Sequence, residues 1–208
     1  RTRAIIIYPM NALANSQLER LSGNILHATD QMFSFVKEFL ANASADRSWV
    51  FTPQTVSLAQ AAQVVARQYA DAAQRKDIPL SLEDESQGAE ALADPAALDQ
   101  VLENLISNAI KFSPPGRPVR IRVKATADGG GEYHIEDEGP GFTPEDRLVM
   151  FRRYRRLSAR PTAGEPSTGL GLSIVSKLVQ SMHGELRCES EPGRGATFIL
   201  RLPPPPAP

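Results

Sequence analysis

Apolar residues recur at steps of three and four positions between residues 18 and 40. This spacing predicts a long helix with a coiled-coil seam, and a second apolar edge at Val36 and Leu40 widens its buried face to that of a four-helix bundle. The seam positions are Leu21, Ile25, Ala28, Met32, Phe35 and Phe39. Because one hairpin cannot complete such a bundle, we expect residues 1–47 to form a truncated helical hairpin that makes a homodimer.

After residue 47 the pattern changes to short segments, some with the helical period of three to four residues and some with the strand period of two. Helices are predicted at residues 58–75 and 170–182, and a further one begins at Asp94-Pro95 and stops before Pro114. Strands are predicted at residues 50–51, 78–82, 119–126, 133–136, 185–189 and 196–202. We expect an α+β fold over residues 48–203, a two-layer sandwich of helices on a mixed, largely antiparallel sheet. The proline-rich tail, residues 204–208, is expected to be disordered.

Composition and charge narrow the classes of function. The formal net charge of -1 gives no general attraction to nucleic acid or to a membrane. The longest apolar run, residues 4–8, is far too short to cross a bilayer, and Cys188, the single cysteine, excludes an internal disulfide. We therefore expect a cytoplasmic chain without membrane contact. Its start within an apolar pattern favours a longer parent protein, whose missing sensor region is a candidate membrane anchor.

Three polar residues share one side of the helix that begins at Asp94-Pro95. Asn104, Asn108 and Lys111 stand at helical spacing, while the apolar residues between them face the core. Two amides and an ammonium suit a phosphate group and a cation, since Mg²⁺ prefers oxygen ligands and keeps several waters. Taken alone, the same stripe is equally compatible with a solvated helix face.

Two glycine-containing motifs follow. In the first, Asp137 ends a predicted strand, and Gly139 and Gly141 let the backbone turn sharply and approach a ligand. A carboxylate there can accept a hydrogen bond from an exocyclic amine, although such a motif is often only a turn. In the second, residues 168–172 open a helix, whose free N–H groups and positive end can receive phosphate.

The order of these motifs, helix amides, strand-end carboxylate, long loop and glycine-rich helix start, resembles the Bergerat-type ATP-binding fold. The resemblance is to the histidine kinase branch of the superfamily that also holds gyrase, Hsp90 and MutL, and it covers residues 1–203. It implies the catalytic core of a bacterial two-component sensor histidine kinase. Such a kinase binds ATP and Mg²⁺, transfers the γ-phosphoryl group to a histidine, and passes it to an aspartate in the receiver domain of a response regulator.

The same resemblance implies a role for each matching residue. Asn108 would bind Mg²⁺ with the help of Asn104, Lys111 would reach the phosphates, Phe112 would lie against the adenine, and Asp137 would hold its amino group. Arg156 falls at the position of a phosphate-contacting arginine. The other residues expected to bind the nucleotide are Gly139, Gly141, Phe142, Tyr154, Thr168, Gly169, Leu170, Gly171 and Leu172.

The loop between Phe142 and Thr168 is rich in arginine. Its arginines are Arg147, Arg152, Arg153, Arg155, Arg156 and Arg160. We favour a mobile lid that closes over a triphosphate. A docking surface for an acidic partner is the second interpretation, and nucleic acid binding is disfavoured because the rest of the chain is not basic.

The phosphoacceptor histidine of the family is absent from this sequence. Residues 1–4 match the end of the motif that carries it, so the acceptor would lie three positions before Arg1, and Thr2 would position water for dephosphorylation of the partner. We interpret His27, His134 and His183 as structural. The chain is therefore expected to bind ATP without phosphorylating itself.

Two other functions are less well supported. A gyrase-like or Hsp90-like ATPase would carry a water-activating glutamate one turn before Asn108, where this chain has Asn104, and adjacent Glu103 points off that face. A non-catalytic scaffold that dimerises and docks a regulator is disfavoured by the intact nucleotide motifs.

Overall fold

A computed structural model of the chain describes residues 21, 29, 51–152, 155, 157–162, 165 and 169–206. Contacts divide the chain into two units, Arg1–Leu40 and Ala41–Pro208. In the first unit, Leu21 and Thr29 are described, and both are helical and exposed. The predicted dimerisation hairpin, including its end at residue 47, otherwise lies outside the described residues and stays a prediction.

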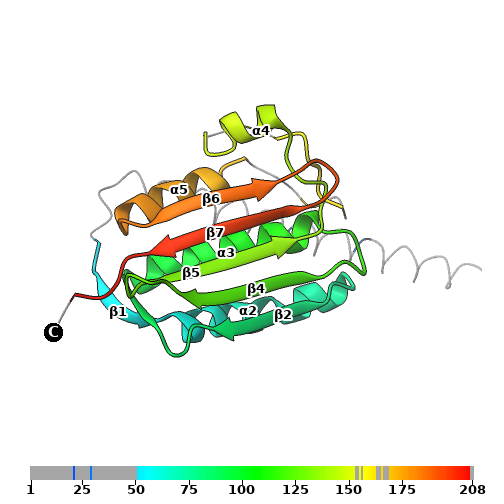
Figure 1. The fold of residues 1–208 in the computed structure, drawn as a ribbon. Helices are drawn as coiled ribbons and strands as arrows, with labels where there is room; N and C mark the ends of the chain where they lie inside the picture. Colours follow the sequence, from blue (N-terminus) through cyan, green and yellow to red (C-terminus); the bar gives the residue numbers. More distant parts are fainter. Residues whose placement is uncertain are drawn as a thin grey trace, which may run out of the picture. The chain divides into compact units, whose positions relative to one another are not determined.

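The second unit contains a five-stranded sheet in the order β2-β4-β5-β7-β6 (Figure 1). Its strands are β2 (Leu80–Glu85), β4 (Val119–Ala125), β5 (Gly131–Asp137), β6 (Glu185–Ser190) and β7 (Ala196–Leu202). The β2 strand runs parallel to β4, and every other pairing in this sheet is antiparallel. The predicted mixed, largely antiparallel sheet is confirmed.

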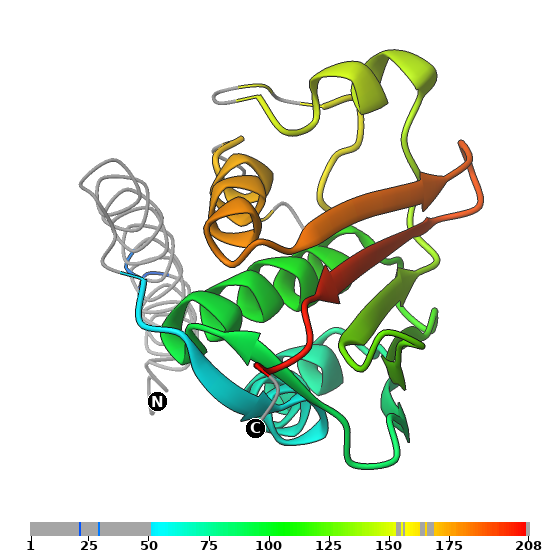
Figure 2. The same ribbon diagram turned by 60° about the vertical axis from the view of Figure 1, so that its left-hand side comes forward.

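Three helices cover one face of this sheet: α2 (Leu58–Arg75), α3 (Pro95–Phe112) and α5 (Gly171–Ser181) (Figures 1 and 2). The opposite face carries no helix among the described elements. The predicted α+β class with two layers is therefore confirmed. None of the described helices combines the length and the apolar character needed to cross a membrane.

Local sequence explains where α2 and α3 begin and end. The Ser57 side chain accepts a hydrogen bond from Gln60 N–H, and the Asp94 carboxylate accepts one from Ala97 N–H at 3.0 Å. Such N-caps satisfy backbone donors that lack a partner within the helix. Proline at the first helical position, Pro95, fits because its missing N–H is one of those donors.

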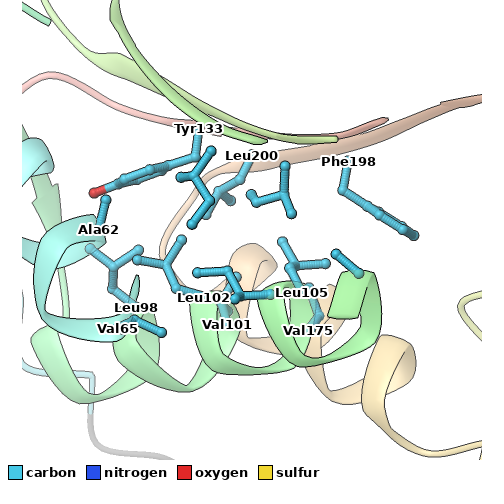
Figure 3. Close-up of a cluster of buried hydrophobic side chains, with 14 of the residues drawn as sticks. Ala62, Val65, Leu98, Val101, Leu102, Leu105, Tyr133, Val175, Phe198 and Leu200 are labelled. Carbon is cyan, nitrogen blue, oxygen red and sulfur yellow. The ribbon is translucent and has the colours of Figure 1, made fainter. Parts of the chain in front are cut away.

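The core lies between α3 and the sheet (Figure 3). Leu98, Leu102 and Leu105 project from α3 and are at most 1% exposed. They face Tyr133 and Leu200, whose side chains come from β5 and β7. The Tyr133 hydroxyl donates a hydrogen bond to Leu58 O at 3.0 Å, so its one polar atom is satisfied within this apolar layer.

The structure corrects the predicted strand at residues 50–51. Phe51 has no regular structure, and its ring packs edge-to-face against His183 with ring centroids 6.4 Å apart. The strand is β1 (Gln54–Ser57), which pairs with β3 (Glu90–Ala93) in a separate two-stranded sheet. The four residues of β3 contain two alanines, which favour strands weakly, so their pattern gave no signal.

A second correction concerns the long loop after Phe142. It begins with a short helix, α4 (Pro144–Val149). Thr143 and Asp146 form a capping box, in which each side chain accepts a hydrogen bond from the backbone of the other. The Thr143-Pro144 start with Asp146 three residues on is a helix signal that the sequence does carry.

We predict that Leu102→Ala lowers the free energy of unfolding by about 2 to 5 kcal/mol, because it leaves a cavity in a site that is fully enclosed. Urea unfolding followed by circular dichroism measures this. Val64→Ala is the control, since that side chain of α2 is 54% exposed and its loss should cost at most about 0.5 kcal/mol. Equal effects of the two substitutions would contradict the packing described.

Candidate functional site

The amides of α3 face the beginning of α5. The position that a Cβ atom of Gly171 would take lies 2.9 Å from Asn104 Oδ1 and 3.9 Å from Asn108 Nδ2. A side chain at position 171 would therefore push the Asn104 amide away from its present place. The structure thus brings together the predicted amide pair and the predicted glycine-rich helix start.

The start of α5 presents a positive helix end at this place. Leu170 holds the N-cap position, but its apolar side chain is 3% exposed and gives no capping hydrogen bond. The first turn contains no acidic residue. Gly169 has a φ of +71°, and a Cβ there would lie 2.7 Å from Arg155 O. The positive φ and the close approach of Arg155 O therefore both require glycine at position 169. The helix end that follows suits an anion.

Asp137 lies at the end of β5, as predicted. Its Oδ1 accepts a hydrogen bond from Gly139 N–H at 2.9 Å. Burial raises the pKa of Asp137 to about 6, although the N–H groups of Gly139 and Ala196 favour its ionised form. A Cβ at Gly139 would lie 3.0 Å from Phe112 O. The carboxylate turn is thus packed against the C-terminal end of α3.

Asp137, Gly139 and Gly141 line a cavity of about 920 Å³. Ser158 and Thr162 of the loop after α4 form another part of its wall. Further lining residues include Arg117, Arg120, Arg160 and Arg194. The lining does not include Asn104, Asn108, Lys111, Phe112 or Gly171. The described residues therefore form two groups, one at the cavity and one at the start of α5.

The end of α3 connects these two groups. Lys111 and Phe112 follow Asn108 by less than two turns, and Lys111 Nζ lies 5.9 Å from the centroid of the Phe112 ring. Thr162, from the cavity wall, donates hydrogen bonds from its N–H to Lys111 O at 3.2 Å and from its hydroxyl to Ser113 O at 2.9 Å. The amide pair, the aromatic ring and the cavity wall thus follow one another along this helix end.

Phe142 and Leu172, two other predicted site residues, pack against the core. The Phe142 ring makes an edge-to-face contact with Phe198 at 5.9 Å between centroids, and its N–H donates to Ser190 Oγ at 2.9 Å. These contacts fix the turn that follows Asp137. Thr2, Tyr154, Arg156 and Thr168 lie outside the described residues, so their predicted roles stay predictions.

Glu103 points toward α2. Its Oε1 accepts a hydrogen bond from Gln68 Nε2 of α2 at 3.2 Å. Asn104 instead donates from Nδ2 to Gln100 O at 2.8 Å, in its own helix. The predicted orientation of Glu103 is confirmed, and this carboxylate has no place beside Asn108.

Sequence reasoning missed the residues that attach the loop after α4. Asp146 accepts hydrogen bonds from the Ser158 hydroxyl and from Ser158 N–H, the latter at 3.0 Å. Lys76 Nζ pairs with Glu165 Oε1 at 2.9 Å. The capping box could have revealed Asp146, but no local pattern links Lys76 to Glu165, which stand 89 positions apart.

In the described part of the chain, no group of three or more His, Cys, Asp or Glu residues could hold a metal ion. The side-chain amides of Asn104 and Asn108 stand at the start of α5 instead. Amide oxygens suit a hard cation that is bound mainly by water and phosphate. The residues present therefore fit Mg²⁺ carried by a nucleotide.

Comparison with known proteins identifies a family and several similar chains. The profile of a family described as histidine kinase-, DNA gyrase B- and HSP90-like ATPases matches residues 93–206. The sensor protein SrrB of Staphylococcus aureus is 37% identical over 108 residues, which are 52% of this chain and 18% of SrrB. The chain therefore spans much less than the length of that relative.

Two solved structures are also similar to this chain. The full-length protein ShkA in complex with AMPPNP has a TM-score of 0.73 and 28% identity, over 88% of this chain and 38% of ShkA. The mycobacterial sensor histidine kinase MprB has a TM-score of 0.60 and 29% identity, over 76% of this chain and 100% of that one.

We predict that Asp137→Asn stabilises the folded chain at pH 8. Because the folded pKa of about 6 exceeds the ordinary value of 3.8, stability from this group is complete below pH 3.8 and is lost as the pH rises through about 6. An amide avoids that loss, which amounts to at most about 3 kcal/mol.

Urea unfolding at pH 4, 6 and 8 tests this prediction. The advantage of Asp137→Asn should grow with pH and vanish near pH 4. Asp71→Asn, on an exposed position of α2, is the control and should show no such trend. An Asp137→Asn protein that is less stable than the wild type at pH 8 would show that burial does not dominate at this carboxylate.

Proposed function

Because this chain belongs to the family of histidine kinase-, DNA gyrase B- and HSP90-like ATPases, we propose that it is the ATP-binding catalytic part of a two-component sensor histidine kinase. The observation that carries the proposal is the approach of the Asn104 and Asn108 amides to Gly171 at the start of α5. Further support comes from the similarity to SrrB and MprB, both named as sensor proteins, and to ShkA, whose structure contains AMPPNP.

The adenine would bind at the Asp137 end of the site. Its exocyclic amine would donate to the Asp137 carboxylate, and the Phe112 ring, half-buried at the end of α3, would lie against the base. The cavity of about 920 Å³ beside Asp137 is large enough for a nucleotide base and its sugar.

The phosphates would bind between α3 and the start of α5. The N–H groups in the first turn of α5 would donate hydrogen bonds to the phosphate oxygens, and Lys111 of α3 would add a positive charge. Asn108, with Asn104, would hold Mg²⁺ through amide oxygen. When bound, the ion would neutralise charge on the phosphates.

The γ-phosphoryl group would be transferred to a histidine. Asn104 occupies the place of a water-activating glutamate, and Glu103 is bound to Gln68, so the site favours transfer over hydrolysis. Arg156 would contact the phosphates during transfer. A response regulator receiver domain would be the next acceptor, Thr2 would assist its dephosphorylation, and residues 1–47 would supply the homodimer.

We predict that Asp137→Ala weakens ATP binding by roughly tenfold to a hundredfold, since it removes a charge-assisted hydrogen bond. Isothermal titration calorimetry at pH 8 measures the affinity. Asp71→Ala, on an exposed position of α2, should bind as the wild type does. Wild-type affinity should also fall as the pH drops below about 6, because the carboxylate becomes protonated. Unchanged affinity in Asp137→Ala would remove the adenine assignment.

For Asn108→Ala, we predict that ATP binding loses its dependence on Mg²⁺, because the amide oxygen beside the phosphates is gone. Titrations with and without Mg²⁺ should give affinities that differ less than those of the wild type. Gln74→Ala, which removes an exposed amide of α2, should keep the wild-type difference. If Asn108→Ala responds to Mg²⁺ as the wild type does, Asn108 is not the ligand.

A further inference from the structure

Lys76 is the first residue after α2, and its ammonium group is almost fully enclosed, with 11% of the side chain exposed. It donates three hydrogen bonds, to Ile110 O at 2.8 Å, to Lys111 O at 2.6 Å and to Glu165 Oε1 at 2.9 Å. An ammonium has three donors. Every donor of Lys76 is therefore used within the chain, and Lys76 can act on a ligand only through its neighbours.

Two of these acceptors belong to the last turn of α3. Carbonyl groups in the last turn have no partner within the helix, and a cation there interacts favourably with the helix dipole. The residue that follows them, Phe112, and Lys111 itself are both candidate site residues. By binding Ile110 O and Lys111 O, Lys76 fixes the direction in which that turn presents them.

The third acceptor, Glu165, belongs to the loop between α4 and α5. Thr162 of the same loop binds Lys111 O and Ser113 O. The loop is therefore attached to the end of α3 at Thr162 and, through Lys76, at Glu165. It continues to Gly169 and to the anion-binding end of α5.

We propose that Lys76 is a positioning residue of the nucleotide site, which holds Glu165 of the loop between α4 and α5 in a fixed place against the last turn of α3. The nucleotide part rests on the proposed function. The attachment itself is a property of the chain alone. Partly buried, charge-assisted hydrogen bonds of this kind are stronger than exposed ion pairs, so their loss should be measurable.

Lys76 makes two kinds of bond, to the end of α3 (the helix arm) and to Glu165 (the loop arm). Hydrogen exchange without added nucleotide measures the two arms separately. Lys76→Met keeps the apolar stem and removes all three bonds, so exchange should speed up at the end of α3 and in residues 157–165. Glu165→Gln weakens only the loop arm, so exchange should speed up in the loop and not in α3. Lys124→Met is the matched control, because Lys124 pairs with Glu85 on the helix-free face of the sheet.

Calorimetry with ATP then tests the positioning role. Lys76→Met should weaken binding about tenfold, because the site is no longer preorganised, and Glu165→Gln should have a smaller effect. The double variant should bind no more weakly than Lys76→Met, since both changes act on one attachment. Lys76→Arg, which keeps the charge, should restore most of the affinity. A purely structural role would lower the free energy of unfolding and leave the ATP affinity of the folded protein unchanged.

The proposal is overturned if Lys76→Met and Glu165→Gln leave loop exchange at the wild-type rate. It is also overturned if both bind ATP as the wild type does, or if Lys124→Met has the same effects. Should Lys76→Met fail to fold, Glu165→Gln decides the loop arm by itself. A wild-type chain that does not bind ATP would refute the proposed function and the positioning role together, whereas the exchange result would still decide the attachment.

Discussion

The burial of α3 against the sheet is the constraint on which the rest of the structure depends. Leu98, Leu102 and Leu105 are enclosed on one side of this helix, so its rotation about its own axis is fixed. Helical geometry then determines where the remaining side chains point. Asn104 and Asn108 must face the start of α5, and they can do so closely because Gly171 has no side chain. The packing that stabilises the domain thus also sets the geometry of the site.

Stability and binding make opposite demands at Asp137. The carboxylate is mostly buried, which raises its pKa, and the N–H groups of Gly139 and Ala196 offset only part of that cost. A neutral side chain there would suit the folded chain better. A charged acceptor would suit an adenine amino group better. Such a conflict between local stability and chemistry is typical of residues that bind a ligand.

Much of the fold could be predicted from the sequence because its elements carry local signals. The apolar period and the Asp94-Pro95 start define α3, and the same period gives α2 with the bounds that the structure shows. Where local signals were weak, prediction failed. The β3 strand is short and alanine-rich. The strand predicted at residues 50–51 is found instead at β1, and Phe51 packs against His183.

The site was predictable only in part. Asn104, Asn108, Asp137 and Gly171 belong to motifs whose order along the chain is informative. The structure places Gly171 beside the two amides, and the turn after Asp137 beside the end of α3. Lys76, Thr162 and Glu165 could not be found in this way. Their contacts join segments far apart in sequence, and each residue type is ordinary for an exposed position.

Under the proposed function, the carboxylate turn, the end of α3 and the start of α5 bind one adenine nucleotide together. The decisive measurement is an ATP titration in the presence of Mg²⁺, followed by the backbone amide resonances of Gly139, Asn108 and Gly171. We expect all three resonances to shift with a single midpoint concentration. Shifts confined to one of these segments, or distinct midpoints for Gly139 and Gly171, would contradict it.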